Sequence, residues 1–181
     1  MIDARHYRKE AAMKNGTAVV IRAIRPDDKQ MLSDAFYELE RESRYLRFFG
    51  FKDHISEGEL KRATEVDFET EVALVVTLVV DGKEIIIGAG RYIALTASAD
   101  SPPAAEVAFA VEEDYHGQGL AGKLFDNLAE IARSKGVSAF VAEVLPRNKP
   151  MIAVFERRGL PMTKKREDGL IHVSLDLTVG G

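Results

Sequence analysis

The chain has 181 residues, of which 46% are hydrophobic and 30% are charged, a composition ordinary for a soluble globular protein. Its formal net charge of −4 argues against nonspecific nucleic-acid binding, which needs a basic face. Because cysteine is absent, disulfides, thiolate nucleophiles and zinc–thiolate sites are excluded.

The N-terminal segment 1–16 is rich in basic residues and has little periodicity, which indicates an arm or a short helix, and of these we expect a loosely held arm. Its charges indicate no signal peptide, and no apolar run in the chain reaches the roughly 20 residues that span a bilayer. We therefore expect a cytoplasmic protein with no membrane partner.

The residues 17–24 (TAVVIRAI) predict an opening strand, and Pro26-Asp27-Asp28 predicts the start of a helix. The expected buried stripe of that helix is Met31, Leu32, Ala35, Phe36 and Leu39. A capping box at Ser56 and Glu59 predicts a second helix. Between the two helices, the segment 43–51 is dense in aromatic residues and arginines. We interpret it as a packed segment beneath a loop, with an acceptor cleft and base stacking as the alternatives.

The residues 72–80 predict an apolar strand, Asp81-Gly82 a tight hairpin turn, and 84–95 the partner strand. Gly88 and Gly90 inside the partner strand indicate a bulge or a close approach by another backbone. The polar segment 96–103 is expected to be a loop.

The stretch 106–122 (EVAFAVEEDYHGQGLAG) predicts a strand, a glycine turn and the start of a helix. Apolar residues alternate on both faces of the strand, which indicates burial on both sides near the middle of a sheet. The helical stripe is Leu120, Leu124, Leu128 and Ile131, and Lys135-Gly136 is a typical helix end.

The glycine turn has two readings. The first amides of a helix have no intrahelical partner and favour an anion, so the turn can hold a phosphate group; it can equally be a tight turn without a ligand. Gly117, Gly119 and Gly122 also spell the G-x-G-x-x-G dinucleotide fingerprint, with Glu143 downstream. We reject that fingerprint, because Glu112–His116 separates the strand from the first glycine and too few residues follow to complete a doubly wound sheet.

The remaining residues predict a strand over 137–144, a helix from Asn148 to Gly159, and a closing hairpin around Asp168-Gly169. The element order is strand, two helices, three antiparallel strands, helix, strand, helix and two strands. This order indicates an α/β fold with a mixed sheet. No internal repeat or linker indicates a second domain.

The motif His116-x-x-Gly119-x-Ala121 after a central strand resembles the coenzyme A pyrophosphate loop of the GNAT superfamily of acyl-CoA-dependent N-acyltransferases. The family pattern there is Arg or Gln, two residues, Gly, one residue, and Gly or Ala, so His116 departs from it. The segment 148–160 follows the family's Asn-x-x-Ala-Ile-x-x-Tyr-x-x-x-Gly-Phe helix at every spacing. The sequence of residues 42–49 (ESRYLRFF) resembles the N-terminal half of bacterial protein lysine acetyltransferases, one branch of this superfamily.

The resemblance covers roughly residues 17–177 and implies a single GNAT-like domain over 17–181. It implies a mixed, mostly antiparallel central sheet with helices on both faces, and a wedge beside the central strand that receives the pantetheine arm. It also implies acetyl-CoA as cosubstrate and no metal. The implied coenzyme-binding residues are Phe109, Ala110, Val111, His116, Gly117, Gln118, Gly119, Leu120, Ala121, Gly122, Lys123, Asn148 and Phe155.

Acyl transfer to an amine needs a base, because a lysine amine has a reference pKa near 10.4 and is protonated at neutral pH. Glu106 is the candidate, since Ala108 and Ala110 share its face and leave space beside the carboxylate. The residues alone leave open that Glu106 is a solvated strand-entry residue. The resemblance favours catalysis, because these acetyltransferases use a glutamate at this place in Ala-Glu-Val-Ala-Phe. Glu143 is the second candidate.

Backbone N–H groups of 109–111 would polarise the thioester carbonyl, as the resemblance implies. Many GNAT enzymes place a proton-donating tyrosine seven residues after the motif asparagine, and this chain has Phe155 there. The thiolate would then leave unassisted, take a proton from water, or use another group. The four histidines are too scattered to indicate a metal site.

The leading hypothesis from the sequence is an N-acetyltransferase that moves an acetyl group from acetyl-CoA to a primary amine. The acceptor that we favour is the side-chain amine of a protein lysine. The alternatives are a small-molecule amine acetyltransferase and a noncatalytic acyl-CoA-binding regulatory module. The sequence leaves the oligomeric state open, with a homodimer as one possibility.

Overall fold

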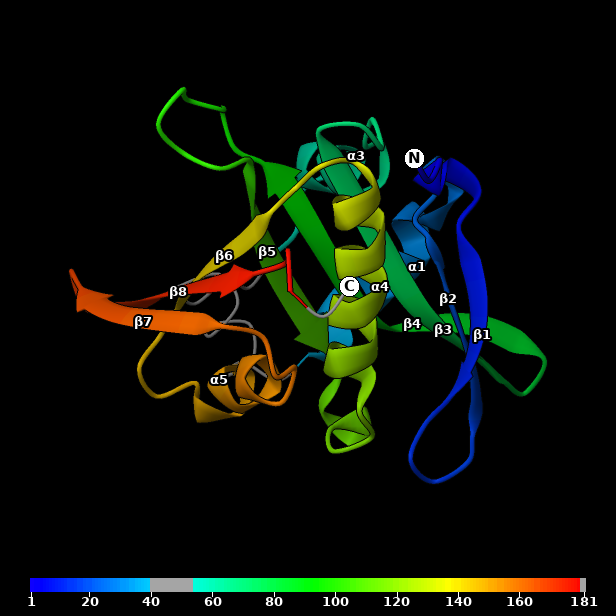
Figure 1. Ribbon diagram of the computed structural model, residues 1–181. Coiled ribbons are helices and arrows are strands. Elements are labelled where there is room, and N and C mark those ends of the chain that lie inside the picture. The colour runs from blue at the N-terminus through cyan, green and yellow to red at the C-terminus, as the bar shows by residue number, and fades with distance from the viewer. Residues whose placement is uncertain (40–53, 180–181) are drawn as a thin grey trace.

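The computed structural model of the protein describes residues 1–39 and 54–179. Within these ranges, eight strands form one sheet in the order β1-β2-β3-β4-β5-β6-β8-β7, and every neighbouring pair is antiparallel except β5 and β6 (Figure 1). The strands are β1 (Arg8–Ala12), β2 (Ala18–Ala23), β3 (Glu71–Val80), β4 (Lys83–Ala94), β5 (Ala104–Val111), β6 (Ala139–Val144), β7 (Met162–Glu167) and β8 (Leu170–Asp176). The expected mixed, mostly antiparallel sheet is confirmed.

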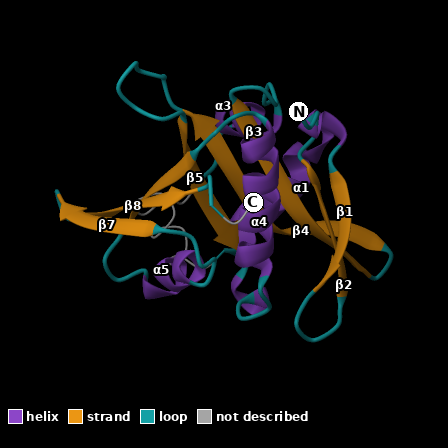
Figure 2. Cartoon of the chain, viewed as in Figure 1, coloured by secondary structure: helices purple, strands orange, loops and turns teal. Residues whose placement is uncertain are grey.

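Helices cover both faces of the sheet. The α-helices of the described residues are α1 (Lys29–Glu38), α3 (Glu57–Thr64), α4 (Leu120–Ser134) and α5 (Lys149–Glu156), and the short 3-10 helices are η1 (Ala4–His6), η2 (Pro26–Asp28) and η3 (Glu113–Tyr115). Helix α4 crosses one face, and α1 and α3 lie behind the sheet (Figure 2). The aromatic segment 43–51 and the similarity at 42–49 lie outside the described residues.

The prediction of a loosely held N-terminal arm is wrong. Residues 8–12 form the edge strand β1, which pairs with β2 from Arg8↔Arg22 to Ala12↔Ala18. Ala4 is fully buried, and the backbone N–H of Ile2 donates to Ser134 Oγ on α4. The sequence RKEAA gives no hydrophobic alternation because both faces of this edge strand are largely exposed, and charged residues are common on sheet edges.

The β3–β4 hairpin follows the prediction closely. Asp81 and Gly82 both have positive φ, at 51° and 77°, as the tight turn requires. The register shifts between Val76 and Thr77, which places a bulge opposite the Gly88 region. At Gly90 a Cβ would lie 2.7 Å from the ring of Phe109, so glycine there allows β5 to pack closely.

Helix α4 packs its predicted stripe onto the sheet, and Leu120, Leu124, Leu128 and Ile131 are all at most 2% exposed. Gly136 ends the helix with φ 82°. On β5, Ala105, Val107 and Phe109 face this core. The opposite side of β5 is more open, because Glu106 is exposed and Ala108 and Ala110 are half-buried. The expectation that β5 is buried on both faces is therefore wrong.

The parallel pairing of β5 and β6 is short. It joins Ala104 to Ala139, Ala105 to Phe140 and Glu106 to Val141, and then the strands separate. Strand β6 continues along β8 instead, as far as Val144↔Ile171. The sheet is therefore split beside the second half of β5, and the N-terminus of α4 lies at the same end of that strand.

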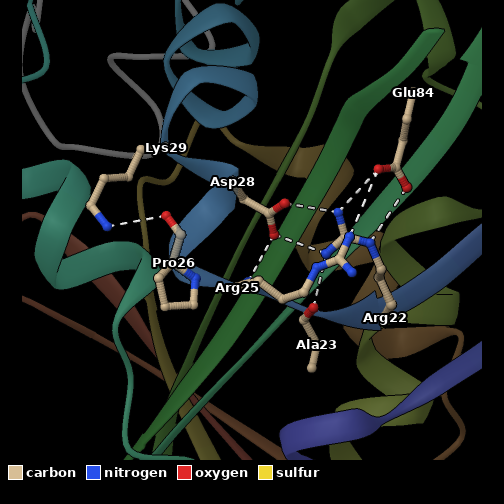
Figure 3. A network of polar contacts seen from close by, with 7 residues as sticks. All are labelled: Arg22, Ala23, Arg25, Pro26, Asp28, Lys29 and Glu84. Atoms are coloured by element: carbon tan, nitrogen blue, oxygen red, sulfur yellow. Dashed lines mark hydrogen bonds and ion pairs between the residues drawn. The ribbon is translucent and has the colours of Figure 1, made fainter.

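An ion-pair network fixes the start of α1 to the sheet (Figure 3). The Arg22 guanidinium on β2 donates to both carboxylate oxygens of Asp28, at 2.8 and 2.9 Å, and to Glu84 on β4. The Asp28 carboxylate also accepts from the backbone N–H of Arg25 at 2.8 Å. Asp28 therefore turns toward the sheet and makes no side-chain cap on α1.

Candidate active site

A cavity of about 610 Å³ lies where β5 and β6 separate. Its wall is the second half of β5, the glycine turn, the first turn of α4, the end of β6 and helix α5. Of the residues that the sequence analysis assigns to catalysis or coenzyme binding, those that line the cavity are Glu106, Phe109, Ala110, Val111, His116, Gly117, Gly119, Leu120, Ala121, Gly122, Asn148 and Phe155. Gln118 and Lys123 are not part of the lining. Segments that are far apart in the sequence thus meet in one cavity.

The glycine turn presents open amides to the cavity. Gly117 and Gly119 have φ 77° and 81°, and a Cβ on Gly117 would meet no atom within 4 Å. Gly119 is the N-cap of α4, and no side chain caps the helix there. The first amides of α4 are therefore available for an anion, and the helix dipole favours one.

Gly122 packs against the side chain of Arg158. A Cβ on Gly122 would lie 2.8 Å from the guanidinium of Arg158, which follows α5. Arg158 donates to the carbonyl of Gly122 at 2.9 Å and to Asp126 at 2.7 Å. The glycine therefore lets an arginine fasten the end of α5 to α4, and Gly122 also lines the cavity.

The side chain of His116 is directed back to β5. Its Nε2 lies 2.7 Å from the carbonyl oxygen of Val111, so the ring donates to the end of the strand. The Gln118 side chain faces the β1–β2 hairpin, where its Oε1 accepts from the backbone N–H of Asn15 at 3.1 Å. Both side chains thus support the shape of the turn.

Two carboxylates lie on the cavity wall. Glu106 is on the open face of β5, and its register partner is Val141 on β6. Glu143 lies two residues further along β6, on the same face of that strand as Val141. Glu143 pairs in register with His172 on β8, and its Oε1 lies 3.8 Å from His172 Nδ1. Both carboxylates are exposed, and Glu106 lies nearest the point where the strands separate.

Phe155 is part of an aromatic cluster. It is 1% exposed, and its ring centroid lies 6.3 Å from that of Phe109 and 6.0 Å from that of Phe125. Asn148 is the N-cap of α5, and its Oδ1 accepts from the backbone N–H of Met151 at 3.4 Å. Both residues shape the wall of the cavity.

Several lining residues were missed by the sequence reasoning. Lys14 comes from the β1–β2 hairpin, Tyr115 directly precedes the first motif, and Met151, Arg157 and Arg158 lie within the second. Burial raises the pKa of Tyr115, and the nearby Glu112 and Asp114 add to the effect, so its hydroxyl stays protonated. Tyr115, Met151, Arg157 and Arg158 could have been found from their positions beside or within the motifs, but the sequence gives no signal for Lys14.

The described residues contain no group of three or more His, Asp or Glu side chains suited to a metal ion. Among the helices that the structure describes, none is long and apolar enough to cross a membrane.

The acetyltransferase (GNAT) family matches residues 31–160 of the chain. The structure is also similar to the crystal structure of the GNAT domain of S. lividans PAT, with a TM-score of 0.83 and 34% sequence identity. The similarity covers 93% of this chain and 96% of that domain. This chain belongs to the GNAT acetyltransferase family. It is a GNAT acetyltransferase domain.

Two curated acetyltransferases are similar over part of their length. Acetyltransferase PA5475 of Pseudomonas aeruginosa is 27% identical over 125 residues, which are 69% of this chain and 65% of that protein. Acetyltransferase Pat of Mycolicibacterium smegmatis is 28% identical over 166 residues, which are 91% of this chain and 47% of that protein. The GNAT chain thus spans about half to two thirds of the length of these relatives.

The cavity fits the coenzyme of this family. The open amides of the glycine turn suit a diphosphate, and the split between β5 and β6 leaves a channel beside the backbone of β5 for an extended arm. The residues that would hold acetyl-CoA are therefore those of the turn, of 109–111 on β5, and of α5.

Proposed function

We propose that this GNAT domain transfers the acetyl group of acetyl-CoA to the side-chain amine of a protein lysine. The observation that carries the proposal is the position of Glu106, an exposed carboxylate on the cavity wall at the last residue pair of the β5–β6 ladder. The resemblance of the sequence motifs to bacterial protein lysine acetyltransferases supports a protein as the acceptor, and the similarity to the GNAT domain of S. lividans PAT extends over almost the whole chain.

Glu106 is proposed as the general base. A lysine arrives as an ammonium ion, and its nitrogen cannot attack until a proton is removed. The residues that follow Glu106 on the same face of β5, Ala108 and Ala110, are small and half-buried, and they leave room along the strand for a lysine side chain. The carboxylate takes the proton directly or through one water molecule.

The backbone of residues 109–111 is proposed to orient the thioester. Strand β6 has separated from β5 at these residues, so their outward amides do not enter the β5–β6 ladder. An amide that points at the carbonyl oxygen stabilises the negative charge that develops there. The amine nitrogen then forms the new C–N bond, and the C–S bond breaks.

The leaving thiolate takes its proton from water in this proposal. Phe155 has no proton to donate. Tyr115 lies in η3, just before the glycine turn, and lines the cavity at the end where the diphosphate is expected. A thiol has a reference pKa near 8.5, so its thiolate is a far better leaving group than an amine and needs little assistance.

The acceptor is tested with a panel of amines. The wild-type chain is incubated with acetyl-CoA and either lysine-containing proteins or small amines, and thiol release is measured together with the mass of each acceptor. We expect acetyl-lysine on a protein and a higher kcat/KM for a protein than for small amines. Turnover of small amines alone would replace the lysine proposal, and coenzyme binding without any turnover would favour the regulatory module. The cytoplasmic location and the oligomeric state remain predictions from the sequence.

A further inference from the structure

The turn of the β1–β2 hairpin lies against the glycine turn. The backbone N–H of Lys14 donates to the carbonyl of Gln118 at 3.3 Å, and the backbone N–H of Asn15 donates to the side chain of Gln118 at 3.1 Å. In Figure 2, the end of this hairpin and the loop before α4 lie at the same end of the molecule. The backbone contacts thus hold the hairpin beside the N-terminus of α4.

The side chain of Lys14 extends over that N-terminus. A Cβ on Gly119 would lie 3.6 Å from Cε of Lys14 and 4.0 Å from its Cγ. Gly119 is the residue that caps α4, and Lys14 lines the cavity. The ammonium group is one bond beyond Cε, so it lies close to the open amides.

Lys14 forms no ion pair with any residue that the structure describes. Of the other basic side chains on the cavity wall, Arg158 is bound to Asp126 and the ring of His116 donates to Val111, whereas Arg157 on the α5 side makes no ion pair with a described residue. A cation held by its backbone over the positive end of a helix is repelled by that end unless an anion lies between them. The arrangement is therefore favourable when a negatively charged group is bound.

We propose that Lys14 binds the diphosphate of acetyl-CoA from above, opposite the amides of the glycine turn. The proposal rests on acetyl-CoA binding in the cavity, as set out for the proposed function. The hairpin then supplies the cationic side chain that the turn itself lacks, because its own histidine is directed to the strand. The N-terminal segment becomes part of the coenzyme site.

The test is calorimetric binding of acetyl-CoA to wild type, Lys14→Met and Lys14→Arg, with Lys61→Met as a control. Lys61 is an exposed lysine on α3, so this control removes the same charge away from the cavity. We expect Lys14→Met to weaken binding about tenfold to a hundredfold, the usual effect of one lost charge-assisted contact. Lys14→Arg and Lys61→Met should bind within about twofold of wild type. The backbone contacts of the hairpin are retained in all three variants.

Two ligand analogues identify which phosphate is bound. The loss in Lys14→Met should be the same for 3′-dephospho-CoA and should vanish for S-acetylpantetheine, which lacks the diphosphate. A loss that disappears with 3′-dephospho-CoA would assign Lys14 to the 3′-phosphate and overturn the proposal. Equal binding of acetyl-CoA by wild type and Lys14→Met would also overturn it while leaving the proposed function intact. If wild type itself bound no acetyl-CoA, the proposed function would fail as well.

Discussion

At the scale of single residues, the structure gives several motif positions a different task from the one their pattern indicates. Gly122 fits the spacing of a ligand-binding glycine, yet it makes room for Arg158. His116 holds the first position of the loop motif, yet its ring donates to Val111. A motif predicts which residues lie near a ligand, but the direction of each side chain depends on its tertiary neighbours, which the sequence does not display.

The tertiary neighbours of Phe155, which the sequence does not display, also lead to a prediction. The sequence invites Phe155→Tyr, because a tyrosine at this position donates a proton in many relatives. The ring is buried against Phe109 and Phe125, so an added hydroxyl would lack a partner and cost about 1–3 kcal/mol. We expect a lower Tm and no gain in kcat, measured by thermal unfolding and steady-state kinetics. A gain of order a hundredfold would show that the hydroxyl reaches the thiolate and that the natural enzyme is impaired.

At the scale of elements, the amphipathic helix α4, its glycine end and both hairpin turns were predictable because each has a strong local signal. Strand β1 was not, because an exposed edge strand needs no apolar alternation. The prediction for the open side of β5, the side that carries Glu106, Ala108 and Ala110, was also wrong. The small apolar residues of that side suggest burial, but β6 separates from β5 and leaves that side facing the cavity.

The turn before α4 gives a prediction with a matched control. Gly119 and Gly136 flank the same helix with φ 81° and 82°, so valine at either position imposes similar backbone strain. Wild type and Gly136→Val should each gain about 2.7 kcal/mol of stability from acetyl-CoA at a hundredfold excess over its dissociation constant. Gly119→Val should gain almost nothing, measured by unfolding with and without acetyl-CoA. An equal gain in both variants would contradict the assignment of the turn.

The network that joins η2 and α1 to the sheet predicts acid sensitivity. Burial alone would raise the pKa of the Asp28 carboxyl, but the hydrogen bonds from Arg22 and from the backbone of Arg25 outweigh burial and lower it. A lowered folded-state pKa contributes stability that is complete above the ordinary value of 3.8 and is lost as the pH falls through the folded value.

Asp28→Asn leaves the buried Arg22 with the partly exposed Glu84 as its one ionic partner among the described residues. Removing one member of a buried ion pair costs about 3–5 kcal/mol. We expect a loss of that order at pH 7 in urea unfolding, and a much smaller difference from wild type below the folded-state pKa of Asp28. A constant difference across this pH range would mean that the aspartate charge does not stabilise the fold.

At the scale of the whole molecule, the sequence predicted the fold because two motifs and their intervening strand fixed the order of the elements. The split sheet brings those motifs to one cavity, with the coenzyme turn at one end and Glu106 on its wall. Lys14 could not be predicted, because it joins the site only when β1 pairs at the sheet edge and the hairpin docks on the turn. The sheet thus assembles one site from residues 14 to 158.

The central claim is that the coenzyme cavity and the acceptor face meet at Glu106. Its most direct test is the pH–rate profile of lysine acetylation by wild type and Glu106→Gln, with acetyl-CoA affinity measured for both. We predict a loss of about 10²–10⁴ in turnover at neutral pH, unchanged coenzyme affinity, and residual activity that keeps rising with pH as free amine replaces ammonium. Near-normal turnover of Glu106→Gln at neutral pH would contradict the account and make Glu143 the residue to test.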